Sequence, residues 1–421
     1  MHIFFLSHYF PPEVNAPASR TYEHARRWAQ EAGVKVTVVT NHPNHPNGVL
    51  YPGYVNRWLT REFIDGIEIY RVKTYLAANA GFARRILNYL TFMVMAVLAS
   101  IPRPKPGVVA ATSPQFFCAL AGYLVSCLKG CPFVFELRDL WPESITAVGA
   151  MRPGFFTRFL ERLELFLYRR ASLIIALTDA FKENLVQRGI PPDKIQVIKN
   201  GVDLAFFSPR EAPAKLREET GASGKFVAAY IGTVGLAHAV EQIVAVAERL
   251  RNNQDILFMI VGEGAQKGAI EKLVAHKALQ NVRVLPGVSK DRVRDYYALS
   301  DVNLVTLKKA DLFRAVIPSK IFEIMAMARP MLFTVNGECR QIIDAAGSGI
   351  FVEPENVEQM AAALTDLSRR RERLKTMALN GRRFVEQHFS RDELARRYLE
   401  LLRQVQGPVN ALPGASKRAK P

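Results

Sequence analysis

The segment around residue 320 carries groups suited to binding a diphosphate. Pro318 suits the start of a helix, and the free amides of a first helical turn bind phosphate. Lys320 adds a positive charge there, and Glu323 lies on the same helix face as Ser319 and Lys320. Amides and an ammonium for a diphosphate, with a carboxylate for a ribose diol, make a coherent nucleotide site. An ordinary capped helix with an exposed Lys–Glu pair is the alternative.

Two glycine turns follow expected strands in the same half of the chain. Glycine lets the backbone approach a phosphate or a sugar closely, and ligands of open α/β sheets lie at strand ends. Because the spacing is not the full dinucleotide fingerprint, a tight turn without a ligand is the alternative. The residues are Gly232, Thr233, Gly235 and His238 in the first turn, and Gly262 and Gly264 in the second.

The loop at residues 9–20, after the first expected strand, has the composition of a binding-site wall. Glu13 and Asn15 are polar, Ala16 keeps the loop thin, and Arg20 is placed to meet an anion. These residues are candidates for an acceptor or cleft site. An ordinary loop with a solvated arginine is the alternative.

Residues 136–144 place charged groups and a large aromatic side chain at the end of a buried strand. Glu136, Arg138, Asp139 and Trp141 stand close together there. Charged groups in such a place are costly unless they serve a site or pair with each other. We favour a site, with a structural Arg–carboxylate pair as the alternative.

Short apolar runs alternate with helical patterns along the chain, which predicts parallel sheets with crossover helices. The sequence therefore indicates an α/β protein with two doubly wound, Rossmann-like domains facing a central cleft. The expected strands are residues 2–6, 35–40, 67–72, 108–112, 132–137 and 173–177, then 226–231, 256–261, 282–285, 302–306, 331–334 and 350–352.

The expected domain boundaries follow from composition. Residues 1–207 form the first domain, and the Pro-, Glu-, Lys- and Gly-rich stretch 208–224 forms a linker. Residues 225–388 form the second domain. Residues 389–406 contain a terminal amphipathic helix, and residues 407–421 form a basic tail that we expect to be disordered.

The net charge and one apolar segment indicate which partners the protein could bind. A net charge of +17 among 421 residues attracts anions, whether nucleic acid, anionic lipid or phosphorylated small molecules. The apolar segment 86–101, from Ile86 to Ile101, is flanked by arginine and lysine and is short for a membrane span. It fits an interfacial helix on anionic lipid, and a helix buried in the domain is the alternative. Four cysteines are too few for a disulfide framework, which favours the cytoplasm.

Taken together, these motifs resemble the retaining glycosyltransferases of family 4, which have the GT-B architecture. The closer likeness is to bacterial enzymes that build O-antigen, capsule and colanic-acid units, including the WbuB-type amino-sugar transferases. The likeness spans nearly the whole chain. Its motifs are Phe10-Pro11-Pro12-Glu13, Arg138-Asp139-Leu140-Trp141-Pro142-Glu143, Asn200-Gly201-Val202-Asp203, Pro318-Ser319-Lys320 and Phe322-Glu323.

The resemblance implies that the second domain binds the nucleotide sugar, the first binds the acceptor, and the last helix returns to the first domain. Glu323 would hold the ribose, Ser319 and Lys320 the diphosphate, and Arg138 with Asp139 would face the donor sugar or the acceptor.

One departure from the family's pattern concerns the donor. Most of the wider family has a second glutamate in this region, where this chain has Ala315. The carboxylate that usually contacts the transferred sugar is therefore missing. The arginine and lysine that commonly flank the diphosphate are not evident either, and Lys320 with Arg314 would replace them.

The function expected from the resemblance is retaining transfer of a sugar, from a UDP-sugar to a polyprenyl-diphosphate-linked saccharide. The sugar would be an N-acetylated amino sugar. We expect no metal or other cofactor, no nucleic-acid partner, and a cytoplasmic enzyme peripheral on the inner face of the membrane. A nucleotide-sugar epimerase of the same architecture and a basic nucleic-acid-binding protein are the alternatives.

Overall fold

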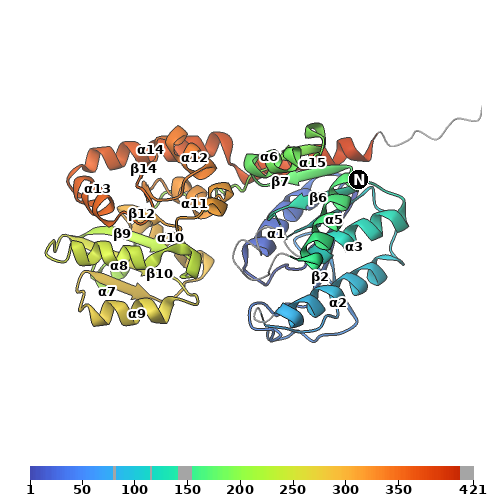
Figure 1. The fold of residues 1–421 in the computed structure, drawn as a ribbon, viewed down its shortest axis with the longest axis horizontal. Coiled ribbons are helices and arrows are strands. Elements are labelled where there is room, and N and C mark those ends of the chain that lie inside the picture. Colours follow the sequence, from blue (N-terminus) through green and yellow to red (C-terminus); the bar gives the residue numbers. More distant parts are fainter. Residues whose placement is uncertain (79–81, 114–115, 141–153, 408–421) are drawn as a thin grey trace, which may run out of the picture. The chain divides into compact units, whose positions relative to one another are not determined.

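The computed structural model describes residues 1–421 except 79–81, 114–115, 141–153 and 408–421. The chain divides into two compact units (Figure 1). The first contains residues 1–198 and the C-terminal segment from Asp392, and the second contains residues 199–391. Both units are α/β and Rossmann-like, as predicted.

The first unit is built on a sheet in the order β3-β4-β2-β1-β5-β6-β7-β8, in which β3 runs antiparallel to β4 and the other pairs are parallel. Apart from the exposed Lys35 at the start of β2, the strands β2, β4, β5 and β6 are buried along their length, because helices cover both faces. The strands are β1 (His2–Leu6), β2 (Lys35–Asn41), β3 (Leu59–Ile64), β4 (Ile67–Val72), β5 (Val108–Thr112), β6 (Phe133–Leu137), β7 (Leu173–Ala176) and β8 (Ile195–Val197).

Helices form a layer on each face of this sheet. On one face α2 packs against α3 and α3 packs against α5 (Figure 1). On the other, α1 and α15 share a core with Ile3 and Phe5. The helices are α1 (Ala16–Gln30), α2 (Phe82–Ser100), α3 (Phe116–Lys129), α5 (Phe155–Arg170), α6 (Asp179–Gln187) and α15 (Arg391–Gln406), with a short 3₁₀ helix, η1 (Pro192–Lys194).

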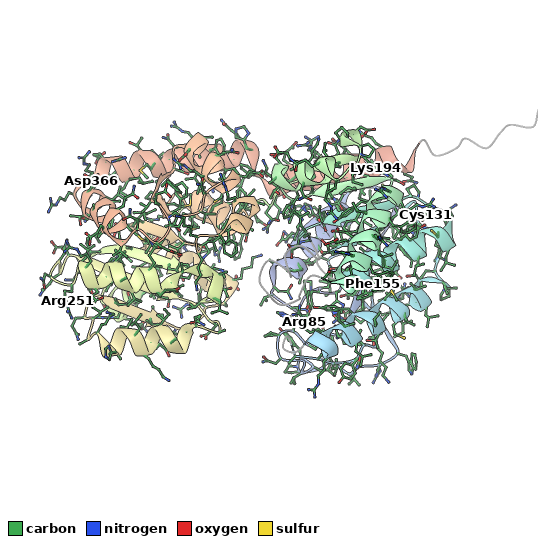
Figure 2. The ribbon with its side chains drawn as sticks, viewed as in Figure 1. Arg85, Cys131, Phe155, Lys194, Arg251 and Asp366 are labelled. Carbon is green, nitrogen blue, oxygen red and sulfur yellow. The ribbon has the colours of Figure 1, made fainter. Side chains whose placement is uncertain are left out.

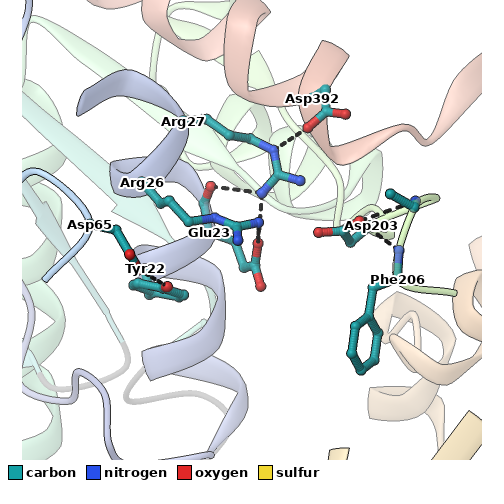
Figure 3. A network of polar contacts seen from close by, with 9 residues as sticks. Tyr22, Glu23, Arg26, Arg27, Asp65, Asp203, Phe206 and Asp392 are labelled. Atoms are coloured by element: carbon teal, nitrogen blue, oxygen red, sulfur yellow. Dashed lines mark hydrogen bonds and ion pairs between the residues drawn. The ribbon is translucent and has the colours of Figure 1, made fainter. Parts of the chain in front are cut away.

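Helix α15 belongs to the first unit although it follows the second in sequence. Tyr398 packs edge-on against Trp28 of α1, and the Trp28 indole N–H donates to the Ala395 carbonyl at 2.9 Å. Arg27 bonds to both Glu23 and Asp392, which joins the two helices (Figure 3).

The second unit is built on a parallel sheet in the order β11-β10-β9-β12-β13-β14. Helices α8, α9 and α13 pack on one face, and α10, α11 and α12 on the other. Helix α14 contributes Leu374 and Met377 to the core on the first of these faces and Val385 to the core on the second. The strands are β9 (Phe226–Ile231), β10 (Ile256–Val261), β11 (Val282–Leu285), β12 (Val302–Val305), β13 (Met331–Phe333) and β14 (Gly349–Phe351). The helices are α7 (Ala214–Glu219), η2 (Leu236–His238), α8 (Val240–Arg249), α9 (Lys267–His276), α10 (Lys290–Leu299), η3 (Asp311–Ala315), α11 (Lys320–Ala326), α12 (Glu338–Ala346), α13 (Val357–Arg369) and α14 (Arg371–His388).

Every expected strand is present, each end within one residue of its predicted position. Strands β3 and β8 were not predicted. β3 alternates exposed and half-buried residues at the sheet edge, and β8 is only three residues long, so neither forms an apolar run.

The prediction of a linker at 208–224 is wrong. The boundary lies between Ile198 and Lys199, and this stretch contains helix α7, whose Leu216 is buried in the core of the second unit. A single apolar side chain on a short helix was too weak a pattern to detect. Phe207, which we placed in the first domain, belongs to the same core. The expected tail at 408–421 lies outside the described residues.

We predict that Trp28→Ala destabilises the first unit by about 3–5 kcal/mol, because it removes the buried contact between α1 and α15. Denaturant unfolding followed by circular dichroism measures this. The matched control is Trp58→Ala, at a site 68% exposed, which should cost about 1 kcal/mol or less. Equal costs for the two variants would contradict the proposed packing role.

Candidate functional site

Helix α11 begins two residues later than expected. Ser319 is its N-cap residue but already has helical dihedral angles, and its side chain makes no capping bond. The amides of Ile321 and Phe322 donate to the carbonyls of Pro318 and Ser319 at 3.1 and 3.2 Å. These tight first-turn bonds satisfy two amides internally, so fewer remain for a ligand than the sequence suggested.

Lys320 lies against the first glycine turn. Its Nζ stands 4.0 Å from the ring centroid of Tyr230, and a Cβ on Gly232 would meet that nitrogen at 2.7 Å. Burial lowers the pKa of Lys320 to about 8, although Glu323 acts in the opposite direction. The structure therefore places a partly desolvated ammonium beside a backbone that lacks a side chain.

Glu323, one turn along α11, is held by Tyr297 of α10. The Tyr297 hydroxyl donates to Oε2 at 3.0 Å. Burial raises the pKa of Glu323, while this hydrogen bond and nearby cations lower it less. Within the described chain no direct ion pair joins Lys320 to Glu323, so the two groups are positioned separately, each by a tyrosine.

The two glycine turns pack against each other through their backbones. A Cβ on Gly262 would meet the Gly232 carbonyl oxygen at 1.8 Å, and one on Gly264 would meet that of Val234 at 2.3 Å. The Val234 amide also donates to the Glu263 carbonyl at 2.9 Å. The two turns therefore lie against each other at the ends of β9 and β10.

The remaining residues of the first turn are arranged around its end. The Thr233 carbonyl accepts from the Tyr230 hydroxyl at 2.6 Å. Gly235 lies against the His238 ring, whose pKa is lowered by burial and by the charge of Lys320. The buried His238 Nδ1 has no hydrogen-bond partner among the described residues.

Arg314 lines a cavity of about 440 Å³ at the ends of β12, β13 and β14. Lys308, Lys309, Thr334 and Asn336 also line it, and sequence reasoning missed all four. Two adjacent lysines after a strand were the signal that was available. The structure thus places Lys320 against the glycine turns, and Arg314 on a basic cavity whose Lys308 amide donates to the Ala237 carbonyl beside the first turn, at 2.9 Å.

In the first unit, the predicted loop residues serve mainly to hold the loops themselves. Glu13 is buried and accepts from the amides of Asn44 and His45, both at 2.9 Å, and burial raises its pKa. Asn15 caps α1 by accepting from the Ala18 amide at 2.9 Å, and Ala16 begins that helix.

The anion that Arg20 meets is Glu136, at 2.8 Å, with both side chains almost fully buried. Arg20 also donates to the Ile198 carbonyl at 2.9 Å. At Glu136 the structure therefore has the Arg–carboxylate pair that was the alternative to a ligand site, and Arg20 is its buried partner and not a solvated arginine. Each charge neutralises the other, which offsets part of the cost of burying the pair.

Arg138 and Asp139 follow β6. The Arg138 guanidinium donates to the Pro17 carbonyl at 3.1 Å, and burial lowers its pKa to about 10. Its buried Nε has no hydrogen-bond partner among the described residues. Asp139 is half-buried, and Trp141 lies outside the described residues.

The segment 86–101 falls largely in α2. Phe92, Ala96 and Ala99 are buried, while Leu87 and Leu98 are exposed, so one face packs in the domain and the other does not. None of the helices in the described ranges is long and apolar enough to cross a membrane.

Comparison with known proteins identifies the family. The descriptions "Glycosyltransferase Family 4" and "Glycosyl transferases group 1" match residues 18–206 and 213–384. The chain belongs to glycosyltransferase family 4. It is 24% identical to the putative colanic acid biosynthesis glycosyl transferase WcaI of Escherichia coli, over 84% of this chain and 89% of that protein. It is 28% identical to the putative colanic acid biosynthesis glycosyltransferase WcaL of Salmonella typhimurium, over 57% of this chain and 58% of that protein.

Solved structures support the GT-B fold of this glycosyltransferase. Sucrose-phosphate synthase from Thermosynechococcus elongatus matches with a TM-score of 0.76 at 17% identity, over 96% of this chain and 98% of that one. Anabaena HepE in complex with UDP matches with a TM-score of 0.70 at 16% identity, over 96% and 99%. Both family descriptions are of glycosyltransferases, so the epimerase alternative gains no support.

We predict that Gly262→Ala disrupts the paired glycine turns of this family 4 enzyme, because the new Cβ meets backbone rather than a movable side chain. The expected loss is roughly 1–3 kcal/mol or more, measured by thermal unfolding. Gly268→Ala on α9 is the matched control, since a Cβ there meets nothing within 4 Å. It should be neutral or stabilise by up to about 1 kcal/mol. Equal behaviour of the two variants would argue against tight turn packing.

Proposed function

We propose that this glycosyltransferase moves a sugar, with retention of configuration, from a UDP-sugar to a polyprenyl-diphosphate-linked saccharide during bacterial surface polysaccharide synthesis. The observation that carries the proposal is the ammonium of Lys320 beside Gly232, with Glu323 one helical turn away. The names of relatives support the pathway, since WcaI and WcaL are named for colanic acid biosynthesis. HepE, which shares the fold, was solved with UDP and with UDP-glucose.

The chemical requirement is to stabilise charge that builds on the UDP leaving group as the anomeric bond breaks. An ammonium held in a site of low dielectric does this without reorganising during the reaction. Lys320 would contact the diphosphate, with Ser319 at the helix start and the Gly232–Gly235 turn beside it. Glu323, held by Tyr297, would accept from the ribose hydroxyls.

We further propose that the reaction needs no metal, because Lys320 supplies the positive charge a cation would otherwise provide. With retention, the acceptor oxygen attacks the face that the phosphate leaves, and the departing phosphate oxygen takes the acceptor proton. Arg138 and Asp139 would face the donor sugar or the acceptor. If the reaction is metal-independent, turnover is unchanged by a chelator such as EDTA, and a loss that added Mg²⁺ or Mn²⁺ restores would reject this part of the proposal.

The donor sugar is proposed to be an N-acetylated amino sugar. The support is the resemblance to amino-sugar transferases and the relationship to a protein named alpha-D-kanosaminyltransferase, 24% identical over 58% of this chain. Ala315 stands where the wider family has the glutamate that contacts the sugar, so the donor cannot be inferred from that family. Screening UDP-sugars by thermal shift, followed by transfer to a lipid-linked monosaccharide, identifies donor and acceptor.

Replacing the two central residues tests the nucleotide site. Lys320→Ala and Glu323→Ala should each lower turnover on the order of 10²- to 10³-fold, the effect of removing one preorganised charge-stabilising group. The matched controls are Glu372→Ala and Lys375→Ala, an exposed pair on α14 with the same spacing of three residues. Wild-type rates in both site variants would reject the site.

The pKa of Lys320 predicts a pH dependence for UDP binding. The last ionisation of the UDP phosphate is complete near pH 7, because its pKa is about 6. Only the charged amine attracts the diphosphate, so affinity should level off between about pH 7 and pH 8 and fall above that, by at most about tenfold per pH unit. Isothermal titration calorimetry from about pH 7 to about pH 10 measures the curve. Lys320→Arg keeps its charge throughout this range and should lose the decline. A decline of the same size in that variant would place the titrating group elsewhere.

A further inference from the structure

Helix α5 exposes a row of alternating aromatic and basic side chains. Phe155, Phe159 and Phe166 are 86%, 52% and 37% exposed, although phenylalanine is normally a core residue. The exposed arginines of this helix are spaced so that they fall on the same face as these rings. We call this set the α5 row. It consists of Phe155, Arg158, Phe159, Arg162, Phe166, Arg169 and Arg170.

The two acidic residues of α5 lie outside this row. Glu164 is on the buried side, where it bonds to Tyr168 and pairs with Arg188 at 2.6 Å. Glu161 falls to one side of the row by helical spacing. The row therefore presents arginine and phenylalanine without carboxylates between them. Phe155, at the start of the helix, is labelled in Figure 2.

The row continues onto the neighbouring helices of the same layer. Phe166 contacts Tyr123 of α3, with ring centroids 5.5 Å apart, and α3 also exposes Leu124 and Leu128. At the far end of α3, Lys129 donates to the carbonyl of Ile101 at 2.6 Å, which places it beside the exposed end of α2. The surface formed by α2, α3 and α5 thus carries exposed apolar side chains across all three helices.

This part of the chain also lacks negative charge. Residues 69–135, which include all of α2 and α3, contain no aspartate and no glutamate. They do contain basic residues close to the exposed apolar positions, such as Arg84, Arg103 and Lys105. On α2 and α3 the surface is therefore apolar, fringed by cations and free of anions, and on α5 the exposed Glu161 lies to one side of the row. Such a surface is complementary to a bilayer whose headgroups are negative.

We propose that the outer surface of α2, α3 and α5 docks onto an anionic lipid bilayer, with the α5 row as its main anchor. The phenylalanine rings enter the headgroup region, and the arginines contact lipid phosphates. This inference rests on the proposed function, because an enzyme that acts on a lipid-linked acceptor has to reach that acceptor at the membrane. It goes beyond the segment 86–101 by making α5 the principal contact.

Two other partners fit the surface less well. Single-stranded nucleic acid binds rows of arginine and aromatic residues, but the exposed Leu124, Leu128 and Leu98 offer no ring for a base to stack on. A second copy of the chain, in a symmetric contact of this surface with itself, would bring arginine rows together without carboxylates to neutralise them. A lipid surface satisfies both the aliphatic and the basic side chains.

The test is sedimentation of the full-length protein with phosphatidylcholine vesicles and with mixed phosphatidylcholine–phosphatidylglycerol vesicles. Wild type should bind the mixed vesicles, more weakly at high salt, and bind phosphatidylcholine much less. Phe159→Ala/Arg162→Gln should lower binding to the mixed vesicles on the order of tenfold. The matched control is Leu379→Ala/Arg383→Gln on α14, since Leu379 is 54% exposed and Arg383 is also exposed.

A parallel measurement of the thermal shift caused by UDP separates this inference from the proposed function. Both double variants should keep the wild-type shift, which also shows that they are folded. Wild type that binds UDP but no vesicles, or a Phe159/Arg162 variant that binds vesicles like the control, would overturn the docking surface. If Phe159→Ala/Arg162→Gln abolishes a dimer that wild type forms in light scattering, and leaves lipid binding unchanged, the surface binds a second copy of the chain. If it abolishes oligothymidine binding and leaves lipid binding unchanged, the surface binds nucleic acid. Lipid binding without UDP binding would instead count against the proposed function.

Discussion

The site depends on holding the Lys320 ammonium where it is only partly hydrated. Removing a charge from water is unfavourable, and this desolvation lowers the pKa of Lys320 to about 8. The Tyr230 ring offsets part of it through the negative face of its π system. The ammonium can reach this position only because residue 232 has no side chain. Such a cation is poorly satisfied by the protein alone, which is what a site for a diphosphate requires.

The position of Lys320 also depends on the backbone contacts that hold Gly232 in place. Gly232 stays in place because Gly262 lies directly against its carbonyl, and Gly264 lies against that of Val234. On the other side, α10 supplies the Tyr297 hydroxyl that fixes Glu323. The ends of β9 and β10 and the helices α10 and α11 therefore converge on one region. The parallel order of the sheet, with β9 beside both β10 and β12, produces that convergence.

The sequence predicted the elements better than the contacts between them. Strands and glycine turns are local patterns, so each was recognisable from a few neighbouring residues. The Arg20–Glu136 pair joins positions 116 residues apart, and no local pattern distinguishes a buried arginine from one facing a ligand. Tyr230 and Tyr297 were missed for the same reason. Their roles come from the neighbours that folding brings to them, Lys320 and Glu323.

The high net charge has different physical consequences in different parts of the chain. A small diphosphate is best held by one cation at close range in a site of low dielectric, the role we propose for Lys320. The negative charge of an anionic bilayer is spread over a wide surface, and hydrated arginines along a helix are attracted to it without being buried. The arginines of the α5 row are all exposed, whereas Lys320 is half-buried and its pKa is lowered by desolvation. The burial of each cation, more than the total charge, therefore indicates which kind of anion it is suited to meet.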